Sequence, residues 1–226
     1  ISCSLHRDTM VDMGEYGVNK LNAAHVFGGP ALSVQTVSKL AGVNISHYAE
    51  INFDGFRDIV DALGGIEVDV PMTIDDEDAG GHLDAGPQTL NGDQALILCR
   101  ARHAYDAYGA GDYYRTANQR MVLGAILKKT LSGNPIMLAR GLNAAAGSVS
   151  TDVTGIELMA LGVRFAGFDM SRDLMSGLEP TEGVYEGGVW YEKVKTDAWA
   201  TMMQRVDAGL APYADESENP TAGLAG

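Results

Sequence analysis

Cysteine is scarce in this sequence, and so are basic side chains and long apolar runs. Two cysteines occur in 226 residues, too few for a disulfide framework, and they lack the spacing of a metal site. Lysine and arginine number 16 against 30 aspartates and glutamates, so the formal net charge is −14. This balance argues against nucleic acid or anionic lipid as a general partner, because both require a basic surface. No run of about 18 apolar residues, the length that spans a bilayer, is present.

The composition is typical of a folded α/β protein. Hydrophobic residues make up 46% of the chain and charged residues 20%, and 226 residues are enough for one domain with a substantial core. Alternating helical and extended patterns predict an α/β layered domain over residues 1–212. Residues 213–226 carry acids, proline and glycine without periodicity, which predicts a disordered tail. Helices are expected at residues 30–41, 54–63, 112–131, 135–146, 154–165 and 196–209, and strands at 48–53, 66–70 and 96–102.

Two local features have alternative interpretations. The acidic run at residues 75–78 lacks the spacing of an EF-hand calcium loop, so it is interpreted as solvated surface. Cys3 and Cys99 are interpreted as two buried thiols, and a disulfide between neighbouring strands stays open as the alternative.

Arginine is concentrated in one part of this acidic chain. Four of the ten arginines fall in the stretch from Arg100 to Arg120. A planar guanidinium donates two parallel hydrogen bonds to a phosphate and stays charged at any ordinary pH, so such a cluster indicates an anion-binding site. The alternative is that these arginines pair with the abundant surface carboxylates.

The expected local structure brings two of these arginines together. Residues 96–102 have the pattern of an apolar strand, in which Arg100 and Arg102 share one face and Cys99 lies on the other. A glycine- and tyrosine-containing loop at residues 104–111 follows the strand.

A helix is expected to begin at Asp112, which is a suitable N-cap residue. Arg115 and Gln119 follow at i+3 and i+7, so all three side chains lie along one side of the helix. The free N–H groups at the start of a helix also favour an anion. The pattern therefore predicts an anion site built from a strand, a loop and a helix.

Several segments occur in a fixed order that extends this interpretation. They are Ser-Leu-His-Arg-Asp-Thr (residues 4–9), Lys-Leu-Asn-Ala-Ala-His-Val-Phe-Gly-Gly-Pro (20–30), Val-Asp-Ala-Leu-Gly-Gly-Ile-Glu-Val-Asp-Val-Pro (60–71), Leu-Asn-Gly-Asp-Gln-Ala-Leu (90–96), Arg-Ala-Arg (100–102) and Gly-Asp-Tyr-Tyr-Arg-Thr-Ala-Asn-Gln-Arg (111–120). Together they resemble the LytR-CpsA-Psr family of bacterial cell-envelope phosphotransferases. The resemblance implies a three-layer α-β-α sandwich with a mixed, twisted central sheet.

The resemblance also implies an activity. Such enzymes take a glycan polymer from an undecaprenyl-pyrophosphate carrier and attach it to peptidoglycan, or to another envelope acceptor, through a phosphodiester. The expected partners are therefore a polyprenyl-pyrophosphate-linked glycan and a peptidoglycan acceptor, at the outer face of the bacterial cytoplasmic membrane. An apolar groove would hold the prenyl chain, and the helix faces at residues 122–131 and 158–165 fit either that groove or plain core.

Site residues follow from the same resemblance. Five side chains match pyrophosphate-binding positions: Arg7, Arg100, Arg102, Arg115 and Gln119. Arg7 and Asp8 are the expected catalytic pair, in which Asp8 either braces Arg7 or acts as a base toward the acceptor hydroxyl. Asp112 is expected to orient Arg115 rather than to contact phosphate.

Magnesium is the cofactor that the resemblance implies, because phosphoryl transfer requires charge neutralisation at the pyrophosphate. The family links magnesium with aspartates of an Asp-x-Arg-Ser/Thr-Asp strand that precedes the segment where this sequence starts, so the metal ligands here are unknown. That strand and an N-terminal membrane helix are expected to be missing from this sequence, and His6 stands where the family usually has proline.

Two other function classes stay open. A truncated or degenerate relative would bind a polyprenyl-phosphate lipid without catalysis, and an envelope regulatory module would act without transfer. Direct nucleic-acid binding is not expected, because the chain is acidic and shows no recognition-helix pattern.

Overall fold

The structure is a computed structural model that describes residues 1–109, 111–132, 134–165, 167 and 173–221. The chain forms two compact units. Unit 1 comprises Ile1–Tyr48 and Met175–Pro220, and unit 2 comprises Ala49–Leu174 and Thr221–Gly226. Along the sequence, unit 2 therefore lies between the two segments that build unit 1. Among the described helices, none combines the length and the apolar character needed to cross a bilayer.

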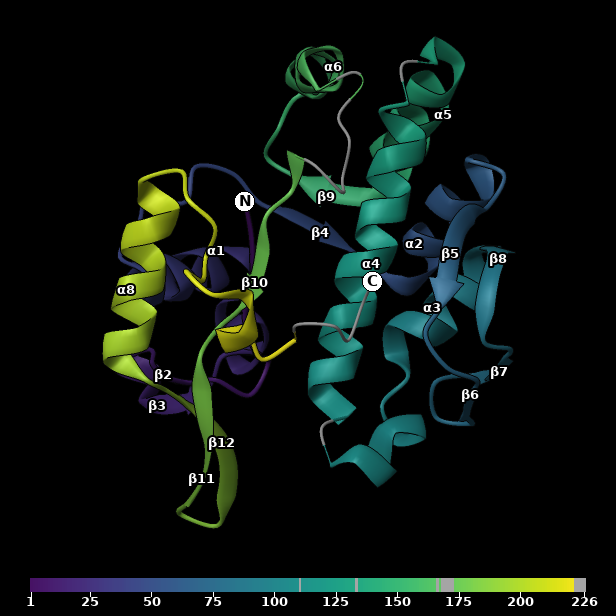
Figure 1. The fold of residues 1–226 in the computed structure, drawn as a ribbon. Coiled ribbons are helices and arrows are strands. Elements are labelled where there is room, and N and C mark those ends of the chain that lie inside the picture. Colours follow the sequence, from purple (N-terminus) through teal and green to yellow (C-terminus); the bar gives the residue numbers. More distant parts are fainter. Residues whose placement is uncertain (110, 133, 166, 168–172, 222–226) are drawn as a thin grey trace. The chain divides into compact units, whose positions relative to one another are not determined.

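Unit 1 contains three strand pairs and two α-helices among its described residues (Figure 1). β1 pairs with β10 in parallel, whereas β2 with β3 and β11 with β12 are antiparallel. The strands are β1 (Ser2–Ser4), β2 (Met10–Asp12), β3 (Val18–Lys20), β10 (Ser176–Leu178), β11 (Thr181–Glu186) and β12 (Val189–Val194). The helices are α1 (Ala23–Ala41), α8 (Thr196–Asp207) and the short 3-10 helices η1 (Gly14–Tyr16) and η3 (Glu216–Glu218).

Helix α1 bends near its start. Gly28 and Gly29 leave helical geometry, and Gly29 has a φ of +60°, a conformation that favours glycine. Pro30 follows as the first residue of the straight segment, where its missing N–H costs nothing. The expected helix over residues 30–41 is therefore confirmed. Its far end is tied to α8, because Trp199 Nε1 donates a hydrogen bond to Leu40 O at 2.8 Å.

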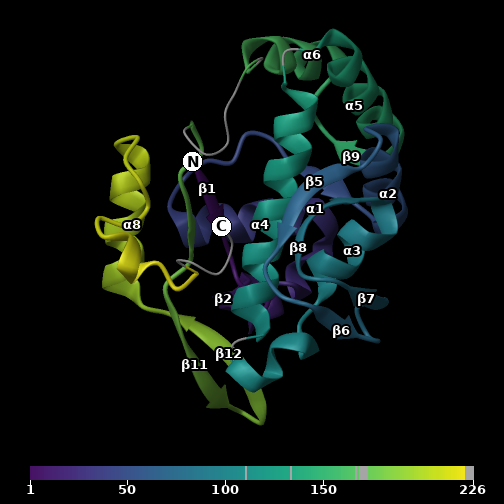
Figure 2. The same cartoon turned by 45° about the vertical axis from the view of Figure 1, so that its right-hand side comes forward.

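Unit 2 combines antiparallel strand pairs with helices that pack on them. β5 pairs with β8, β6 with β7 and β4 with β9. The strands are β4 (Ala49–Ile51), β5 (Ile66–Val70), β6 (Ile74–Asp76), β7 (Gly81–Leu83), β8 (Gly86–Leu90) and β9 (Val149–Thr151). The helices are α2 (Phe53–Ala62), α3 (Gly92–Arg100), η2 (His103–Tyr108), α4 (Gly111–Thr130), α5 (Pro135–Ser148) and α6 (Gly155–Arg164). Figures 1 and 2 both show α4 alongside α3 and the β5–β8 pair.

The core of unit 2 follows from the alternating pattern of β5. Ile66, Val68 and Val70 are buried while the acids between them are exposed, as the sequence predicted for residues 66–70. These side chains pack with Leu98 of α3 and with other buried residues of the same cluster, which include Leu90, Ala101, Tyr105 and Val122. The core therefore joins the hairpin to the segment that carries the clustered arginines.

The strand expected at residues 96–102 is wrong, because α3 occupies this position. Asn91 Oδ1 accepts a hydrogen bond from Gln94 N at 2.9 Å, and Gln94 Oε1 accepts one from Asn91 N at 3.0 Å. This reciprocal capping starts a helix just before the apolar run. A short apolar run fits a buried helix as well as a strand, so the cap decided the outcome.

Ordered contacts extend beyond the expected domain boundary at residue 212. Helix η3 covers Glu216–Glu218, Asn219 and Thr221 are buried, and Arg120 donates a hydrogen bond to Thr221 Oγ1. Residues 222–226 of the expected tail lie outside the described residues, and the single domain over residues 1–212 stays a prediction. Cys3 and Cys99 are both free thiols, so the disulfide alternative is wrong.

Candidate functional site

The turn between β1 and β2 carries Arg7 and Asp8 in unit 1. Arg7 Nε donates a hydrogen bond to Asp8 Oδ1 at 3.2 Å, and Lys20 Nζ donates one to Asp8 Oδ2 at 3.0 Å. The Arg7 side chain remains 53% exposed. Because cationic donors occupy both carboxylate oxygens of Asp8, the geometry fits the bracing role expected for Asp8 better than the role of a base.

A buried glutamate lies beneath this turn and ties its two ends together. Glu179 Oε2 accepts a hydrogen bond from His6 N at 3.1 Å and lies 2.7 Å from Thr9 Oγ1. Glu179 is fully buried, and its Oε1 has no hydrogen-bond partner within the described chain. Burial raises the pKa of Glu179, although the bonds from Thr9 and His6 oppose the shift. Sequence reasoning missed this residue, because it lies 173 positions from His6 and in no recognisable motif.

Arg100 is the last residue of α3, and two contacts hold its guanidinium. Its Nη2 donates a hydrogen bond to Asp78 O at 2.7 Å. Its Cζ lies 5.1 Å from the centroid of the Phe53 ring, within cation–π range. The side chain stays exposed between these contacts, so an anion has access to it.

Arg102 lies two residues beyond the end of α3 and is the N-cap residue of η2. It therefore does not share a strand face with Arg100, contrary to the expectation. Its side chain is exposed and forms no hydrogen bond or ion pair with any described residue. A Cβ added at Gly111 would lie 2.7 Å from Arg102 O and 2.8 Å from Arg102 Cγ. Arg102 thus packs directly against the first residue of α4, where free N–H groups favour an anion.

The first turns of α4 supply the remaining expected residues. The helix begins at Gly111, so Asp112 lies within its first turn and is not the expected N-cap. Asp112 forms an ion pair with Arg115, which is the geometry that the orienting role requires. Gln119 Nε2 donates a hydrogen bond to Cys99 O at 3.0 Å, at the end of α3. The structure therefore brings α3, η2 and the start of α4 together around the arginines.

Two buried polar side chains fix these elements in place. Asn118 Nδ2 donates hydrogen bonds to the Tyr105 hydroxyl at 2.9 Å and to Leu98 O at 3.3 Å. The Tyr105 ring stacks on Tyr114 with centroids 4.4 Å apart. The backbone that carries these arginines is therefore packed in place and needs little ordering when an anion binds.

The acidic run at residues 75–78 is not uniformly solvated, and the interpretation as surface is wrong for Asp76. Asp76 is 4% exposed and accepts hydrogen bonds from Ala79 N at 3.0 Å, Arg102 N at 2.9 Å and His103 N at 2.8 Å. Burial alone would raise the pKa of Asp76, but the backbone hydrogen bonds outweigh burial and hold it below its usual range. Sequence reasoning missed Asp76 because its partners lie on another segment.

Magnesium stays an expectation, and the described residues do not identify its ligands. Across those residues, no group of three or more histidine, cysteine, aspartate or glutamate side chains gathers into a metal site. The carboxylate of Asp8 accepts hydrogen bonds from Arg7 and Lys20, and the carboxylate of Asp76 accepts hydrogen bonds from backbone N–H groups. Neither of these carboxylates is therefore open to a metal ion in the structure.

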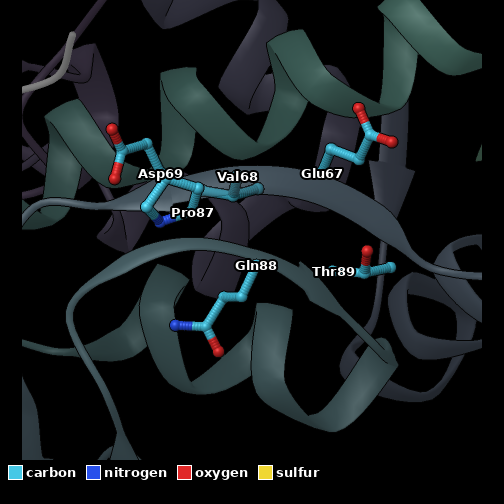
Figure 3. Close-up of a pocket in the computed structure, with 6 residues that line it drawn as sticks. All are labelled: Glu67, Val68, Asp69, Pro87, Gln88 and Thr89. Atoms are coloured by element: carbon cyan, nitrogen blue, oxygen red, sulfur yellow. The ribbon is translucent and has the colours of Figure 1, made fainter.

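One surface hollow of unit 2 lies on the β5–β8 pair and does not suit an anion. It has a volume of about 370 Å³ and is lined by Glu67, Val68, Asp69, Pro87, Gln88 and Thr89. Figure 3 shows the carboxylates of Glu67 and Asp69 projecting to the same side of β5. Negative charges in this position would repel a phosphate, and no arginine lines the hollow.

A smaller, mostly apolar hollow lies where α4, α5 and α6 meet. Its volume is about 190 Å³, and its lining includes Leu131, Leu138 and Val163. The two candidate helix faces differ: Val122 of α4 belongs to the core, whereas Met159 and Val163 of α6 are 50% and 64% exposed. On α4, Val122, Ala125 and Ile126 therefore belong to or pack on the core while Leu123 is exposed, and the α6 face is an exposed apolar surface.

Comparisons with known proteins give a consistent result. The sequence model of the LytR_cpsA_psr family matches residues 2–207. A polyisoprenyl-teichoic acid–peptidoglycan teichoic acid transferase TagU of Enterococcus faecalis is 33% identical over 207 residues, covering 90% of this chain and 65% of that protein. The TagU of Bacillus mycoides is 32% identical over 219 residues, covering 92% of this chain and 67% of that protein. This chain thus spans about two thirds of the length of these curated relatives.

Solved structures agree with the sequence matches. The crystal structure of B. subtilis TagV superimposes with a TM-score of 0.81 at 27% identity, covering 92% of this chain and 82% of that one. A structure from Enterococcus faecalis described as a transcriptional regulator gives a TM-score of 0.79 at 29% identity, covering 96% of this chain and 80% of that one. The expected α/β fold class, an α-β-α sandwich, is confirmed by these likenesses.

Proposed function

This chain belongs to the LytR_cpsA_psr family, and from that premise we propose that it transfers a glycan polymer to peptidoglycan. The proposed donor is a polyprenyl-pyrophosphate-linked polymer, and the proposed product is a phosphodiester between polymer and acceptor. The names of the relatives, which are teichoic acid transferases acting with peptidoglycan, support the acceptor and the polymer class.

One observation carries the proposal of a pyrophosphate donor. On a chain of net charge −14, the Arg102 guanidinium forms no ion pair with any described carboxylate and packs against the start of α4. Arg100 extends from the preceding helix, and Gln119 reaches the end of that helix. A guanidinium left without a carboxylate in so acidic a protein is available for an anion.

The proposed chemistry follows from charge. In phosphoryl transfer, negative charge develops on the oxygens around the transferred phosphorus, and fixed cations stabilise it most effectively when they need not reorganise. Arg100, Arg102 and Arg115 of unit 2 would supply this charge, and Arg7 stays a proposed catalytic residue of unit 1. Asp8 would hold Arg7, and Asp112 would hold Arg115.

The lipid part of the donor and the location of the reaction belong to the same proposal. The exposed apolar face of α6, with the hollow beside it, is the surface that would accept part of a prenyl chain. Because both a polyprenyl carrier and peptidoglycan would be used, we place the reaction at the outer face of the cytoplasmic membrane.

Calorimetric titration with a short polyprenyl pyrophosphate tests the proposal. Wild-type chain is compared with the Arg100→Ala/Arg102→Ala variant and with Lys193→Ala/Lys195→Ala, which removes the same charge from two exposed residues of unit 1. We expect binding that the first variant loses and the second keeps. If the two variants bound with equal affinity, the loss would come from net charge alone, and the assignment of Arg100 and Arg102 to the pyrophosphate site would be contradicted. Parallel titrations with and without magnesium test the cofactor expectation.

A second function, binding of the lipid carrier without transfer, is favoured by one specific observation. Both carboxylate oxygens of Asp8 are engaged by cations, and the described residues form no metal site of their own. Assay of polymer transfer to peptidoglycan separates the two functions, because only the transferase releases polyprenyl phosphate. Binding with no release would establish the non-catalytic alternative.

A further inference from the structure

Asp76 stands apart from its acidic neighbours. It ends β6 and is buried, whereas Asp75 and Asp78 next to it have side chains 88% and 86% exposed. Its Oδ1 closes the hairpin turn by accepting a hydrogen bond from Ala79 N at 3.0 Å. Its Oδ2 is left for another segment of the chain.

That other segment is the junction between α3 and η2. Asp76 Oδ2 accepts hydrogen bonds from Arg102 N at 2.9 Å and from His103 N at 2.8 Å. These N–H groups open η2 and have no helical partner of their own, so Asp76 acts as a cap supplied from 26 residues away. A buried carboxylate that accepts backbone N–H bonds fixes the direction of the chain at the residue that presents Arg102.

The same hairpin also holds the other arginine. Arg100 Nη2 donates to Asp78 O at 2.7 Å, two residues after Asp76. His103 approaches the Asp78 carboxylate with Nε2 at 3.4 Å from Oδ2. The β6–β7 hairpin therefore contacts the guanidinium group of Arg100 and the backbone N–H group of Arg102.

A carboxylate close to an anion site normally weakens anion binding, and the geometry of Asp76 avoids this. Its two oxygens accept three backbone N–H bonds, and the side chain is shielded from solvent. These bonds stabilise the ionised form and hold the pKa of Asp76 below its usual range, despite the burial that opposes this. The negative charge is thereby directed at the backbone and away from the exposed guanidinium groups.

We propose that Asp76 is a positioning residue of the anion site, whose carboxylate fixes the backbone from which Arg102 reaches the pyrophosphate. This inference rests on the proposed function, since it assigns Asp76 a part in the same site. Asp76 does not touch the ligand. It acts through Arg102, and that dependence separates it from a residue needed only for folding.

The test is a double-mutant cycle in titrations of this chain with a short polyprenyl pyrophosphate. Asp76→Asn keeps the shape of the side chain but replaces one acceptor oxygen by an N–H₂ group that faces backbone donors. The matched control is Asp75→Asn, which removes the same charge from the exposed neighbour. We expect Asp76→Asn to weaken binding about tenfold or more, the scale of a misplaced contact group, while Asp75→Asn binds as wild type.

The cycle then shows whether Asp76 acts through Arg102. In an Arg102→Ala background, Asp76→Asn should cause no further loss, because the side chain that it positions is gone. The inference would be overturned if Asp76→Asn weakened binding by the same factor with and without Arg102, or if Asp76→Asn bound with wild-type affinity. Should Asp76→Asn fail to fold, Asp76→Glu replaces it: its longer stem displaces the carboxylate, and wild-type affinity of that variant would overturn the inference equally.

Failure of the proposed function gives a different result. If Arg102→Ala alone binds as tightly as wild type, the pyrophosphate site itself is wrong, and the role of Asp76 is wrong with it. If Arg102→Ala weakens binding and Asp76→Asn does not, only the inference about Asp76 fails. Amide exchange gives a further readout, since the Arg102 and His103 amides should be protected in the wild type and lose protection in Asp76→Asn.

Discussion

Replacement of Gly111 by alanine tests the contact between the start of α4 and Arg102. The added Cβ would lie 2.7 Å from Arg102 O and 2.8 Å from Arg102 Cγ. The Cγ atom belongs to a flexible side chain and can rotate away. The carbonyl oxygen belongs to the backbone next to the Asp76 cap, so relief requires a shift of α4 or of the Arg102 segment.

Two opposing effects decide the magnitude. Alanine favours a helix over glycine by up to about 1 kcal/mol. Forcing one extra carbon into a packed contact costs about 1–3 kcal/mol. We therefore expect a net loss on the order of 1 kcal/mol, which lowers the melting temperature of a chain this long by about 2–4 °C. Because the displaced residue is Arg102, binding of polyprenyl pyrophosphate should weaken at the same time.

Gly147→Ala is the matched control for this change. Gly147 is helical and lies near the end of α5, and a Cβ added there meets no atom within 4 Å. Urea unfolding should show Gly147→Ala as stable as wild type or slightly more stable, with unchanged binding. If Gly111→Ala behaved in the same way as this control in both assays, the close packing of α4 on Arg102 would be refuted.

Three further outcomes follow from buried groups. Burial raises the pKa of Glu179, so the protonated side chain contributes fully to stability below the ordinary glutamate pKa, and this contribution is lost as pH rises through the raised value. The urea midpoint of wild type should therefore fall from acidic to neutral pH more than the midpoint of Glu179→Gln. The same pH dependence of both midpoints would contradict this. Burial raises the pKa of Cys99 to about 12, so a thiol reagent at mildly alkaline pH should modify Cys3 well before Cys99 in the folded chain and both at similar rates in urea. Tyr105→Phe leaves the buried Asn118 amide without one acceptor and should cost about 1–3 kcal/mol in urea unfolding; an unchanged midpoint would show that the bond does not form in solution.

Local rules predicted the elements whose signals lie within one segment. The alternation in residues 66–70 predicted β5, and the helix expected over residues 154–165 is α6, which a Thr154–Glu157 capping box starts. The spacing of Asp112 and Arg115 predicted the side chains that form the ion pair on α4. In each case the deciding interaction joins residues at most a few positions apart.

The features that the sequence did not predict depend on interactions between distant segments or on signals that were ambiguous. The apolar run before Arg100 gave no basis for choosing helix over strand, and the reciprocal cap at Asn91 was overlooked. Asp76 and Glu179 gave no signal, because an acid in a polar stretch is ordinarily solvated. Their partners are the backbone of Arg102 and the turn at His6, far away along the chain. Only the folded chain shows which acid is buried.

The division of unit 1 into two separated segments sets the order in which a growing chain can complete it. β1 pairs with β10, and the hydrogen bond from His6 N to Glu179 can form only after Glu179 has been synthesised, 173 residues later. At roughly 5–20 residues per second on the ribosome, about 9–35 seconds separate the synthesis of these two residues. Within that interval residues 49–174 emerge and can begin to fold before β10, the partner of β1 among the described strands, has been made. The contacts of Glu179 with the turn that carries Arg7 are thus made late, and during this interval a chaperone or a protease would meet residues 1–48 before unit 1 is complete.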